Sequence, residues 1–427
     1  MIEDSIRKWN PWWAQKESLS KLSGIKRDIL DNLFKTISLT HIKDIIGVRR
    51  AGKTTVMYQV IKSLLTEIES KDIAFLNFDD SEINEASFED ILKSLAKINL
   101  EIKYLFVDEI QQKPNWERWI RTLYDTKTFK QIFVSGSSAS LLSQDIGRIL
   151  TGRHLTFTVF PFSFKEVLEF IKWEKFDMDF LEYNKNKILY YQRNYIKNGG
   201  FPETLGKNDS ERKIILTNIY NDLLARDISS RFGASYNIVK KISYHLLSNI
   251  TKEFSYRSVS NSANVSVETV EKYLGFLKES FILFTLDFFS YKTKVQFKQN
   301  KKIYCIDNGL RNAVSFKFSE DEGKLYENQV FIELKRRNEE IYYWKYNGGE
   351  VDFVVKKDLN VKELIQVCYD IKDEKTKKRE IKSLIYASKE LKCNNLIVIT
   401  EDYKKEEKID DKKIKYIPLW EWLLNYK

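Results

Sequence analysis

The segment from residue 47 to residue 55 has the residue types and spacing of a phosphate-binding loop. It satisfies the pattern GxxxxGK[ST] and reads Gly47-Val48-Arg49-Arg50-Ala51-Gly52-Lys53-Thr54-Thr55. Glycines let backbone N–H groups close around a phosphate, and the N-terminus of a following helix adds its positive dipole end. We expect this loop to bind ATP, with Lys53 on the β- and γ-phosphates and the Thr54 hydroxyl on Mg²⁺.

Two carboxylates further along the chain complete a hydrolytic site. The apolar run Leu105-Phe106-Val107 ends in Asp108 and Glu109. At the carboxyl end of a buried parallel strand, Asp108 would join Thr54 in holding Mg²⁺, and Glu109 would orient or deprotonate the attacking water. Two acids after a strand are also common in solvated turns, but their pairing with the loop favours the catalytic interpretation.

Polar residues after the next apolar run, and two arginines beyond them, are further catalytic candidates. Ser135 and Ser137 follow the run 131–134, at a position that senses the γ-phosphate in P-loop ATPases with an additional strand. They would serve equally well as the N-cap of a helix. Arg148 and Arg153 would reach a phosphate in the same chain or in a neighbouring subunit, although surface packing is the commoner role of a single arginine.

An alternation of helices and strands must position these residues. Helical stretches are expected at 25–35, 54–68, 85–98 and 116–124, and strands at 44–46, 73–78, 104–107, 131–134 and 156–160. Such alternation predicts an α/β fold, with a parallel sheet covered by helices on both faces. The loop and the two acids would then lie at the edge of the sheet where ligands bind.

The middle of the chain has a helix-turn-helix pattern followed by two strand-like runs. Helices are expected at 258–263 and 267–278, and the runs 281–289 and 301–306 would form a β-wing. Lysines in the second helix and the wing, interleaved with Tyr291 and Phe297, would suit contacts with DNA phosphates. They are Lys272, Lys278, Lys292, Lys294, Lys298, Lys301 and Lys302. Winged helices also serve as lids or subunit contacts, which leaves that alternative open.

The motifs occur in an order that resembles a known family. They are Gly47–Thr55, Asp108-Glu109, 135–138, Gly152-Arg153, 161–166, 199–203 and 304–307. The chain is similar to archaeal and bacterial AAA+ ATPases whose C-terminal half carries a degenerate restriction-endonuclease-like domain. The resemblance implies an AAA+ core with an N-terminal extension at 1–160, a helical lid or linker at 161–228, a winged-helix domain at 229–315 and a nuclease-like α/β domain at 316–427. It also favours a homo-oligomer, and it implies no substrate.

The expected nuclease-like domain can be compared with the chemistry of PD-(D/E)xK enzymes. These place a helix Glu, a strand Asp and an (E/Q)xK pair around Mg²⁺, and the matching residues here are Glu327, Asp352 and Gln366. Cys368 stands where the lysine would be. A thiol supplies no cation and a neutral amide is a poor metal ligand, so we expect a relic that does not cleave. Lys362 or Glu363 could take over the missing role, which keeps nuclease activity open.

Composition sets broader limits on the class of protein. A chain of 427 residues exceeds one ordinary core. Its 71 basic and 61 acidic residues give a net charge of +10, which fits DNA or an ordinary solvated surface. The three cysteines and three histidines lack metal-ligand spacing, so free buried thiols in a reducing compartment are expected. With no signal peptide and no long apolar segment, we expect a cytoplasmic protein without a membrane partner.

Three functions are compatible with these features. The favoured one is an enzyme that hydrolyses ATP to ADP and phosphate and acts as a switch or motor on DNA. A signal-transduction nucleotide switch that scaffolds a protein partner is the second, and an ATP-dependent nuclease is the third. The segment Trp9-Asn10-Pro11-Trp12-Trp13 could dock a partner, but aromatic packing against the ATPase core is favoured.

Overall fold

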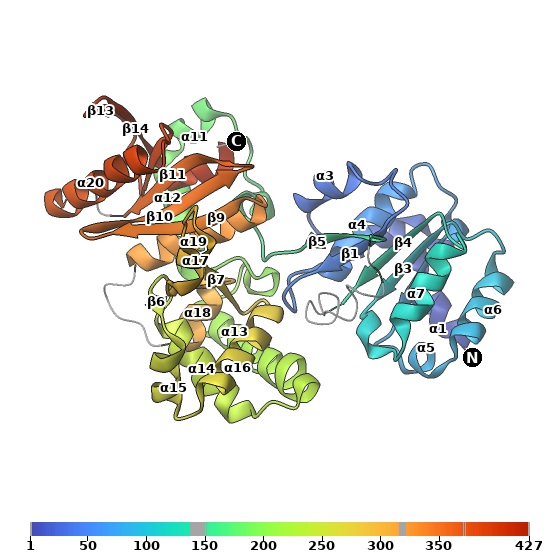
Figure 1. Cartoon of the computed structure of the whole chain (residues 1–427). Helices are drawn as coiled ribbons and strands as arrows, with labels where there is room; N and C mark the ends of the chain where they lie inside the picture. Colours follow the sequence, from blue (N-terminus) through green and yellow to red (C-terminus); the bar gives the residue numbers. More distant parts are fainter. Residues whose placement is uncertain are drawn as a thin grey trace. The chain divides into compact units, whose positions relative to one another are not determined.

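The chain forms two compact units, Met1–Phe160 and Pro161–Lys427 (Figure 1). The computed structural model describes residues 2–136, 150, 152–315, 322–369, 371 and 373–425. Within these residues no helix combines the length and the apolar character that crossing a bilayer requires. Cys305, Cys368 and Cys393 are buried free thiols, as expected.

The first unit is built on a five-stranded parallel sheet in the order β2-β3-β4-β1-β5. The strands are β1 (Ile42–Ile46), β2 (Ile73–Asn77), β3 (Tyr104–Asp108), β4 (Gln131–Ser135) and β5 (His154–Thr158). Every residue of β1 to β4 is buried, which explains the apolar runs that mark β2, β3 and β4 in the sequence, whereas β1 also buries Lys43 and Asp44. The predicted parallel-sheet α/β core is therefore confirmed, and the ends of β1, β3 and β4 lie at one edge.

Helices cover both faces of this sheet. α4 (Lys53–Leu64) lies on one face, and α6 (Phe88–Ile98) and α7 (Trp116–Asp125) lie on the other (Figure 1). The remaining helices are α1 (Ile2–Trp9), α2 (Leu19–Leu22), α3 (Ile29–Phe34) and α5 (Ser81–Glu85). The prediction of one helix over 85–98 is wrong, because Ala86 and Ser87 are extended and the Ser87 side chain accepts the Asp90 N–H as an N-cap.

The N-terminal aromatic segment packs against β2. The Asn10 side chain accepts a hydrogen bond from the Phe75 N–H and donates one to the Phe75 carbonyl, both at 2.7 Å. The indole N–H groups of Trp12 and Trp13 donate to the Ile73 carbonyl at 3.3 and 2.8 Å. Trp12 is buried, so this segment belongs to the core of the first unit, as favoured from the sequence.

The second unit begins with helices and continues into a small antiparallel sheet of order β6-β8-β7. The first helices are α10 (Phe164–Phe170), α11 (Met178–Tyr183), α12 (Lys185–Asn198) and α13 (Asp209–Asp222), which runs into a π-helical stretch, η6 (Leu223–Ser230). There follow α14 (Tyr236–Ser248), β6 (Glu253–Phe254), α15 (Tyr256–Ala263), α16 (Val267–Glu279), β7 (Leu283–Leu286), α17 (Thr293–Lys298) and β8 (Lys301–Cys305). α16 buries Val270, Leu274 and Leu277, the face that its apolar spacing predicts.

The C-terminal part contains a six-stranded mixed sheet in the order β13-β14-β12-β11-β10-β9. Its strands are β9 (Glu340–Tyr346), β10 (Gly349–Lys357), β11 (Asn360–Cys368), β12 (Leu396–Thr400), β13 (Lys405–Ile409) and β14 (Lys412–Pro418). The accompanying helices are α18 (Asn308–Val314), α19 (Glu322–Arg336), α20 (Glu374–Glu390) and α21 (Leu419–Asn425). Phe289 N–H donates to the Tyr343 carbonyl at 2.7 Å, and Tyr343 N–H to the Asp287 carbonyl at 3.0 Å, so the backbone joins the two sheets.

Candidate functional site

Two glycines shape the turn between β1 and α4. Gly47 has a φ of +148°, and a Cβ atom there would lie 2.2 Å from the Val159 carbonyl oxygen. Gly52, at the N-cap of α4, has a φ of +97°, a backbone conformation that side chains disfavour. Glycine is therefore required at both positions by the local packing and the backbone conformation.

Asp108 is held between two hydroxyl groups at the edge of the sheet. Thr54 Oγ1 donates to Asp108 Oδ2 at 2.6 Å, and Ser135 Oγ donates to Asp108 Oδ1. Burial raises the pKa of Asp108 to about 6, with a further contribution from the adjacent Glu109 carboxylate. The fold thus brings together Thr54, Asp108 and Ser135, which come from α4, β3 and β4.

Lys53 lies inside the loop itself. Its ammonium donates to the Gly47 carbonyl at 3.1 Å and to the Val48 carbonyl at 3.3 Å, and the side chain is buried. A buried cation enclosed by the loop backbone is placed to contact a phosphate bound in that loop.

Glu109 is held differently from its neighbour. It leaves β3 in the left-handed region, with φ 51° and ψ 40°, and its side chain is half-buried. Its carboxylate accepts a hydrogen bond from Gln111 Nε2 at 2.5 Å. The strained backbone turns Glu109 away from the buried position of Asp108. Gln111 belongs to no motif, so sequence reasoning had no signal for it.

Arg27 holds the loop from outside and was also missed. Its guanidinium donates to the Ala51 carbonyl at 2.8 Å and to the Phe160 carbonyl at 2.7 Å, and it is 3% exposed. Its backbone N–H donates to Gln59 Oε1 at 3.2 Å. Because a single arginine upstream of the loop has no diagnostic spacing, only the three-dimensional structure reveals this contact.

The oxygen donors at this edge fit a Mg²⁺ ion bound together with ATP. Thr54 Oγ1 and Asp108 Oδ2, 2.6 Å apart, are close enough to face the same ion, and hydroxyl and carboxylate oxygens are the ligand types that Mg²⁺ takes. When bound, the ion would neutralise charge on the phosphate oxygens during transfer to water.

Arg153 lies at the opposite edge of the sheet from the loop. Its carbonyl accepts the N–H of Ile42, the first residue of β1, whereas Gly47 follows the last. A strand of this length separates the two edges by about 16 Å. The Arg153 guanidinium pairs with Asp125 at 2.8 Å. Within one chain, therefore, Arg153 does not reach the phosphate loop, and a role towards a neighbouring subunit stays a prediction. Arg148 and Ser137 lie outside the described residues.

The lysines expected to contact DNA separate into exposed and buried ones. Those that face solvent lie on α16 and in the connection between β7 and β8: Lys272, Lys278, Lys292, Lys294 and Lys298. Lys301 pairs with Asp287 at 2.8 Å. Lys302 is 2% exposed, so the expectation that it contacts phosphate is wrong.

Three carboxylates surround the Lys302 ammonium, and they include both acids of the expected relic. The ammonium lies 3.2 Å from Glu327 Oε1, 3.0 Å from Glu350 Oε1 and 3.6 Å from Asp352 Oδ1. The Tyr304 hydroxyl donates to the same Glu327 oxygen at 2.7 Å. Lys302 and Tyr304 belong to β8, Glu327 to α19, and Glu350 and Asp352 to β10. We call these five residues the acidic cluster.

Gln366 lies beside the acidic cluster as a structural amide. Its Oε1 accepts the Asp352 N–H at 3.3 Å, and its Nε2 donates to Glu380 at 2.5 Å. Lys362 pairs with Glu339 at 2.8 Å. The cation in the cluster is therefore Lys302 from β8, and neither Lys362 nor Cys368 supplies it.

The acidic cluster does not fit a bound Mg²⁺ ion. The place between Glu327 and Asp352 is taken by an ammonium, and a neutral amide stands at the third ligand position. Among the described residues no group of three or more His, Cys, Asp or Glu side chains is arranged to hold a metal.

Comparison with known proteins gives three consecutive family matches. The AAA domain model matches residues 40–168, and two models named domain of unknown function match 190–321 (DUF8612) and 322–422 (DUF4143). MJ1544 of Methanocaldococcus jannaschii, described as an uncharacterized protein, is 36% identical over 96% of this chain and 93% of its own length. The chain belongs to the same family of AAA-domain proteins as MJ1544.

Other relatives of this AAA-domain protein are more distant. An uncharacterized protein of Haemophilus influenzae is 28% identical over 94% of this chain and 99% of its own length. Among solved structures, the Orc1 protein of Aeropyrum pernix in complex with DNA is 9% identical, with a TM-score of 0.31 over 70% of this chain and 95% of that one. At that score no function is transferred. The AAA match and the parallel sheet confirm the predicted AAA+ P-loop core and its ATPase-type nucleotide binding.

Proposed function

We propose that this protein is a Mg²⁺-dependent ATPase whose nucleotide state controls an attached DNA-associated module that does not cleave. The observation that carries the ATPase proposal is the contact between Thr54 Oγ1 and Asp108 Oδ2 at 2.6 Å, beside Glu109 and at the end of the loop. This contact supports the proposal because Thr54 and Asp108 would hold the ion next to Glu109, which is only half-buried.

Each residue at this edge has a separate role in hydrolysis. Lys53 binds the β- and γ-phosphate oxygens, while Thr54 and Asp108 hold the metal ion. Ser135 fixes the second oxygen of Asp108, so it positions the ion ligand. Glu109 orients the attacking water and accepts its proton, and Gln111 holds the Glu109 carboxylate through its amide.

The elements from α14 to β8 support a winged-helix interpretation of the middle region. α14, β6, α15, α16, β7 and β8 follow one another in the order of that fold, and the short helix α17 lies in the connection between β7 and β8. The connection between β7 and β8 carries exposed lysines together with Tyr291 and Phe297, which are 65% and 78% exposed. Cations next to exposed aromatic rings suit the phosphates and bases of nucleic acid, so DNA is the partner we propose.

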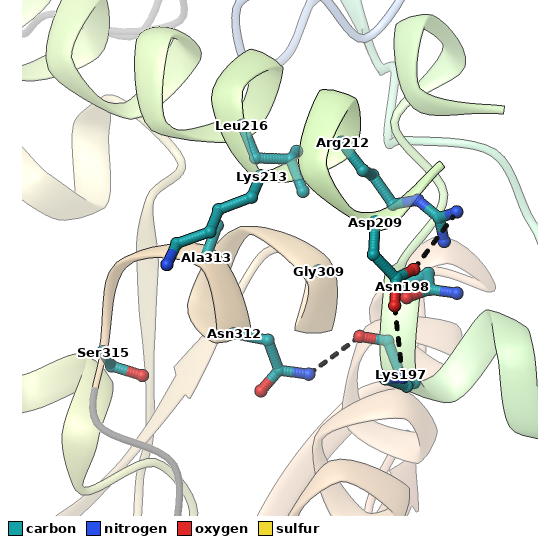
Figure 2. A pocket seen from close by; sticks show the side chains of 10 residues that line it. All are labelled: Lys197, Asn198, Asp209, Arg212, Lys213, Leu216, Gly309, Asn312, Ala313 and Ser315. Atoms are coloured by element: carbon teal, nitrogen blue, oxygen red, sulfur yellow. Dashed lines mark hydrogen bonds and ion pairs between the residues drawn. The ribbon is translucent and has the colours of Figure 1, made fainter. Parts of the chain in front are cut away.

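A second basic surface supports an anionic partner. A cavity of about 370 Å³ is bordered by Lys197 of α12, Arg212 and Lys213 of α13, and residues of α18. Figure 2 shows the side chains that line it. Asp209 lies 3.7 Å from the Lys197 ammonium and 3.6 Å from the Arg212 guanidinium. Three cations against one carboxylate leave this rim positively charged.

The DNA part of the proposal is tested by measuring ATP hydrolysis with and without single-stranded and duplex DNA. We expect DNA to raise the rate in the unaltered protein and to raise it much less in Lys292→Glu/Lys294→Glu. The matched control is Lys16→Glu/Lys21→Glu, which makes the same charge change at exposed positions of the first unit and should retain the stimulation.

Hydrolysis that no DNA alters would contradict the DNA-associated function and favour the nucleotide switch that scaffolds a protein. Loss of hydrolysis itself in Lys53→Ala is expected in either case. The ATPase proposal and the DNA proposal are therefore tested by separate measurements.

A further inference from the structure

We propose that the Lys302 ammonium is the resident cation of the acidic cluster and replaces a divalent metal ion there. This inference is independent of the proposed ATPase, because the acidic cluster lies entirely in the second unit. It assigns a binding role to a residue that the sequence suggested for DNA. It also explains how the largely buried carboxylates of Glu327 and Asp352 are tolerated close together, beside the more exposed Glu350.

The geometry is that of a cation site built by two elements. Glu327 of α19 and the pair Glu350 and Asp352 of β10 direct carboxylate oxygens at one point, and the Lys302 ammonium lies 3.0 to 3.6 Å from all three. Divalent cations such as Ca²⁺ and Mg²⁺ are held by oxygen ligands of this kind, at the shorter distances of about 2.0–2.6 Å. The spacing found here suits an ammonium, and its presence excludes a metal ion from the same volume.

The charges are consistent with a permanent cation. The three carboxylates raise the pKa of Lys302 above its ordinary value even though burial acts in the opposite direction. Burial and the Glu327 carboxylate raise the pKa of Asp352, which shows how poorly a second negative charge is accommodated. Removal of the ammonium would leave the carboxylates without a counter-charge, and they would then take up protons or an external cation.

β8 supplies the cation, so the ammonium also links two parts of the second unit. Lys302 and Tyr304 both reach the acidic cluster from the small antiparallel sheet, while Glu327 and Asp352 come from the C-terminal α/β part. A mobile metal ion would leave this contact dependent on the ion concentration, whereas a lysine makes it part of the chain.

Binding of Mn²⁺ to the full-length protein tests the proposal. All proteins carry Asp108→Asn and contain no nucleotide, so that the ATP site contributes little. Free Mn²⁺ is measured by electron paramagnetic resonance. We expect Lys302→Met to bind one more Mn²⁺ ion than its parent, with an affinity for this ion at least tenfold higher than that of the parent. Adding Asp352→Asn to Lys302→Met should abolish the gain.

A second variant keeps the test decisive if Lys302→Met does not fold. Lys302→Met/Glu350→Gln removes one ammonium and one carboxylate, keeps Glu327 and Asp352, and should also gain Mn²⁺ binding together with a rise in thermal midpoint when Mn²⁺ is added. The proposal is overturned if the folded variants gain no Mn²⁺ site. It is equally overturned if the Lys302-containing parent already binds Mn²⁺ in a way that Asp352→Asn removes.

Discussion

Asp108 and Glu109 are adjacent in the sequence but have opposite environments. Asp108 is buried and accepts hydrogen bonds from two hydroxyl groups, whereas Glu109 is half-buried and accepts one from an amide. A change of charge at Glu109 should therefore leave the groups that hold ATP and its ion in place. The two acids can be separated experimentally for this reason.

Glu109→Gln should keep ATP bound while stopping turnover. The amide retains the size of the side chain but cannot accept a proton from water, so phosphate release should fall by at least about 100-fold. ATP affinity, measured by fluorescence titration, should change little, in contrast to Lys53→Ala, which should bind ATP much more weakly. Turnover at the normal rate would show that another residue positions the water.

Gly47→Ala should destabilise the first unit strongly. The added methyl group would lie 2.2 Å from a backbone oxygen, at a φ of +148° that alanine disfavours. We expect a loss of about 3 kcal/mol or more in the free energy of unfolding, measured with urea. Gly152→Ala is the matched control, because its φ is +71° but nothing lies within 4 Å, and it should cost about 1–2 kcal/mol. Equal losses would show that the contact with Val159 is unimportant.

Local spacing decides which site residues can be predicted from the sequence. The loop and the two acids were predictable because their chemistry depends on neighbours in the chain. Arg27 and Lys302 were not, since each acts on groups that only folding brings near. Gln111 lies two residues from Glu109, but it belongs to no motif that would have marked it. Lys302 even carried a misleading signal, because a lysine beside other lysines on a wing resembles a phosphate contact.

At the scale of elements, β1 is unusual because it buries two charged side chains between its neighbours. Lys43 donates to Gln131 Oε1 at 2.8 Å on β4, and Asp44 contacts His154 Nδ1 on β5. Burial raises the pKa of Asp44, and burial also lowers the pKa of Lys43 to about 8. These polar contacts connect β1 to both of its neighbouring strands, β4 and β5.

The contribution of His154 to the stability of the first unit should fall as the pH rises above neutrality. The hydrogen bond to Asp44 raises the pKa of His154, so the folded state binds the proton more tightly than the unfolded state. The resulting stabilisation is complete below the unfolded value of about 6.5 and is lost as the pH rises through the raised pKa. Between the unfolded and the folded pKa, only the folded state holds the proton. Over this range the free energy of unfolding should fall by about 1.4 kcal/mol for each pH unit.

Thermal midpoints at pH 6 and pH 9 would measure this effect. The unaltered protein should lose more stability over that interval than His154→Gln, which has no proton to release. Identical pH dependence in the two proteins would assign the loss to other groups.

Buried strands were predictable as apolar runs, and helices from their periodicity, but elements with mixed faces were not. β13 and β14 escaped prediction because lysines and glutamates fill their exposed positions. The break between α5 and α6 was missed because Ala86 and Ser87 continue a helical pattern, and only the cap at Ser87 ends it.

At the scale of the whole molecule, Arg153 lies at the edge of the sheet opposite the phosphate loop. It could therefore contact a phosphate only in a neighbouring copy of the chain. If copies of this chain place Arg153 against a neighbour's phosphates, ATP should promote assembly. We expect the mass measured by light scattering to at least double when ATP and Mg²⁺ are added to Glu109→Gln. Lys53→Ala should remain unchanged under the same conditions. An equal mass with and without ATP would contradict a nucleotide-dependent oligomer.

The pairing of the N-terminal segment with β2 has a consequence for solubility. β2 is the last strand on its side of the sheet, so its outward N–H and carbonyl groups have no strand partner. The side chains of Asn10, Trp12 and Trp13 form hydrogen bonds with the Ile73 carbonyl and with the Phe75 N–H and carbonyl. Because these partners are side chains, they offer no backbone edge to which a further strand could pair. A chain that began after residue 13 would present an unprotected edge on which strands of other molecules could add, and amyloid-like self-association would follow.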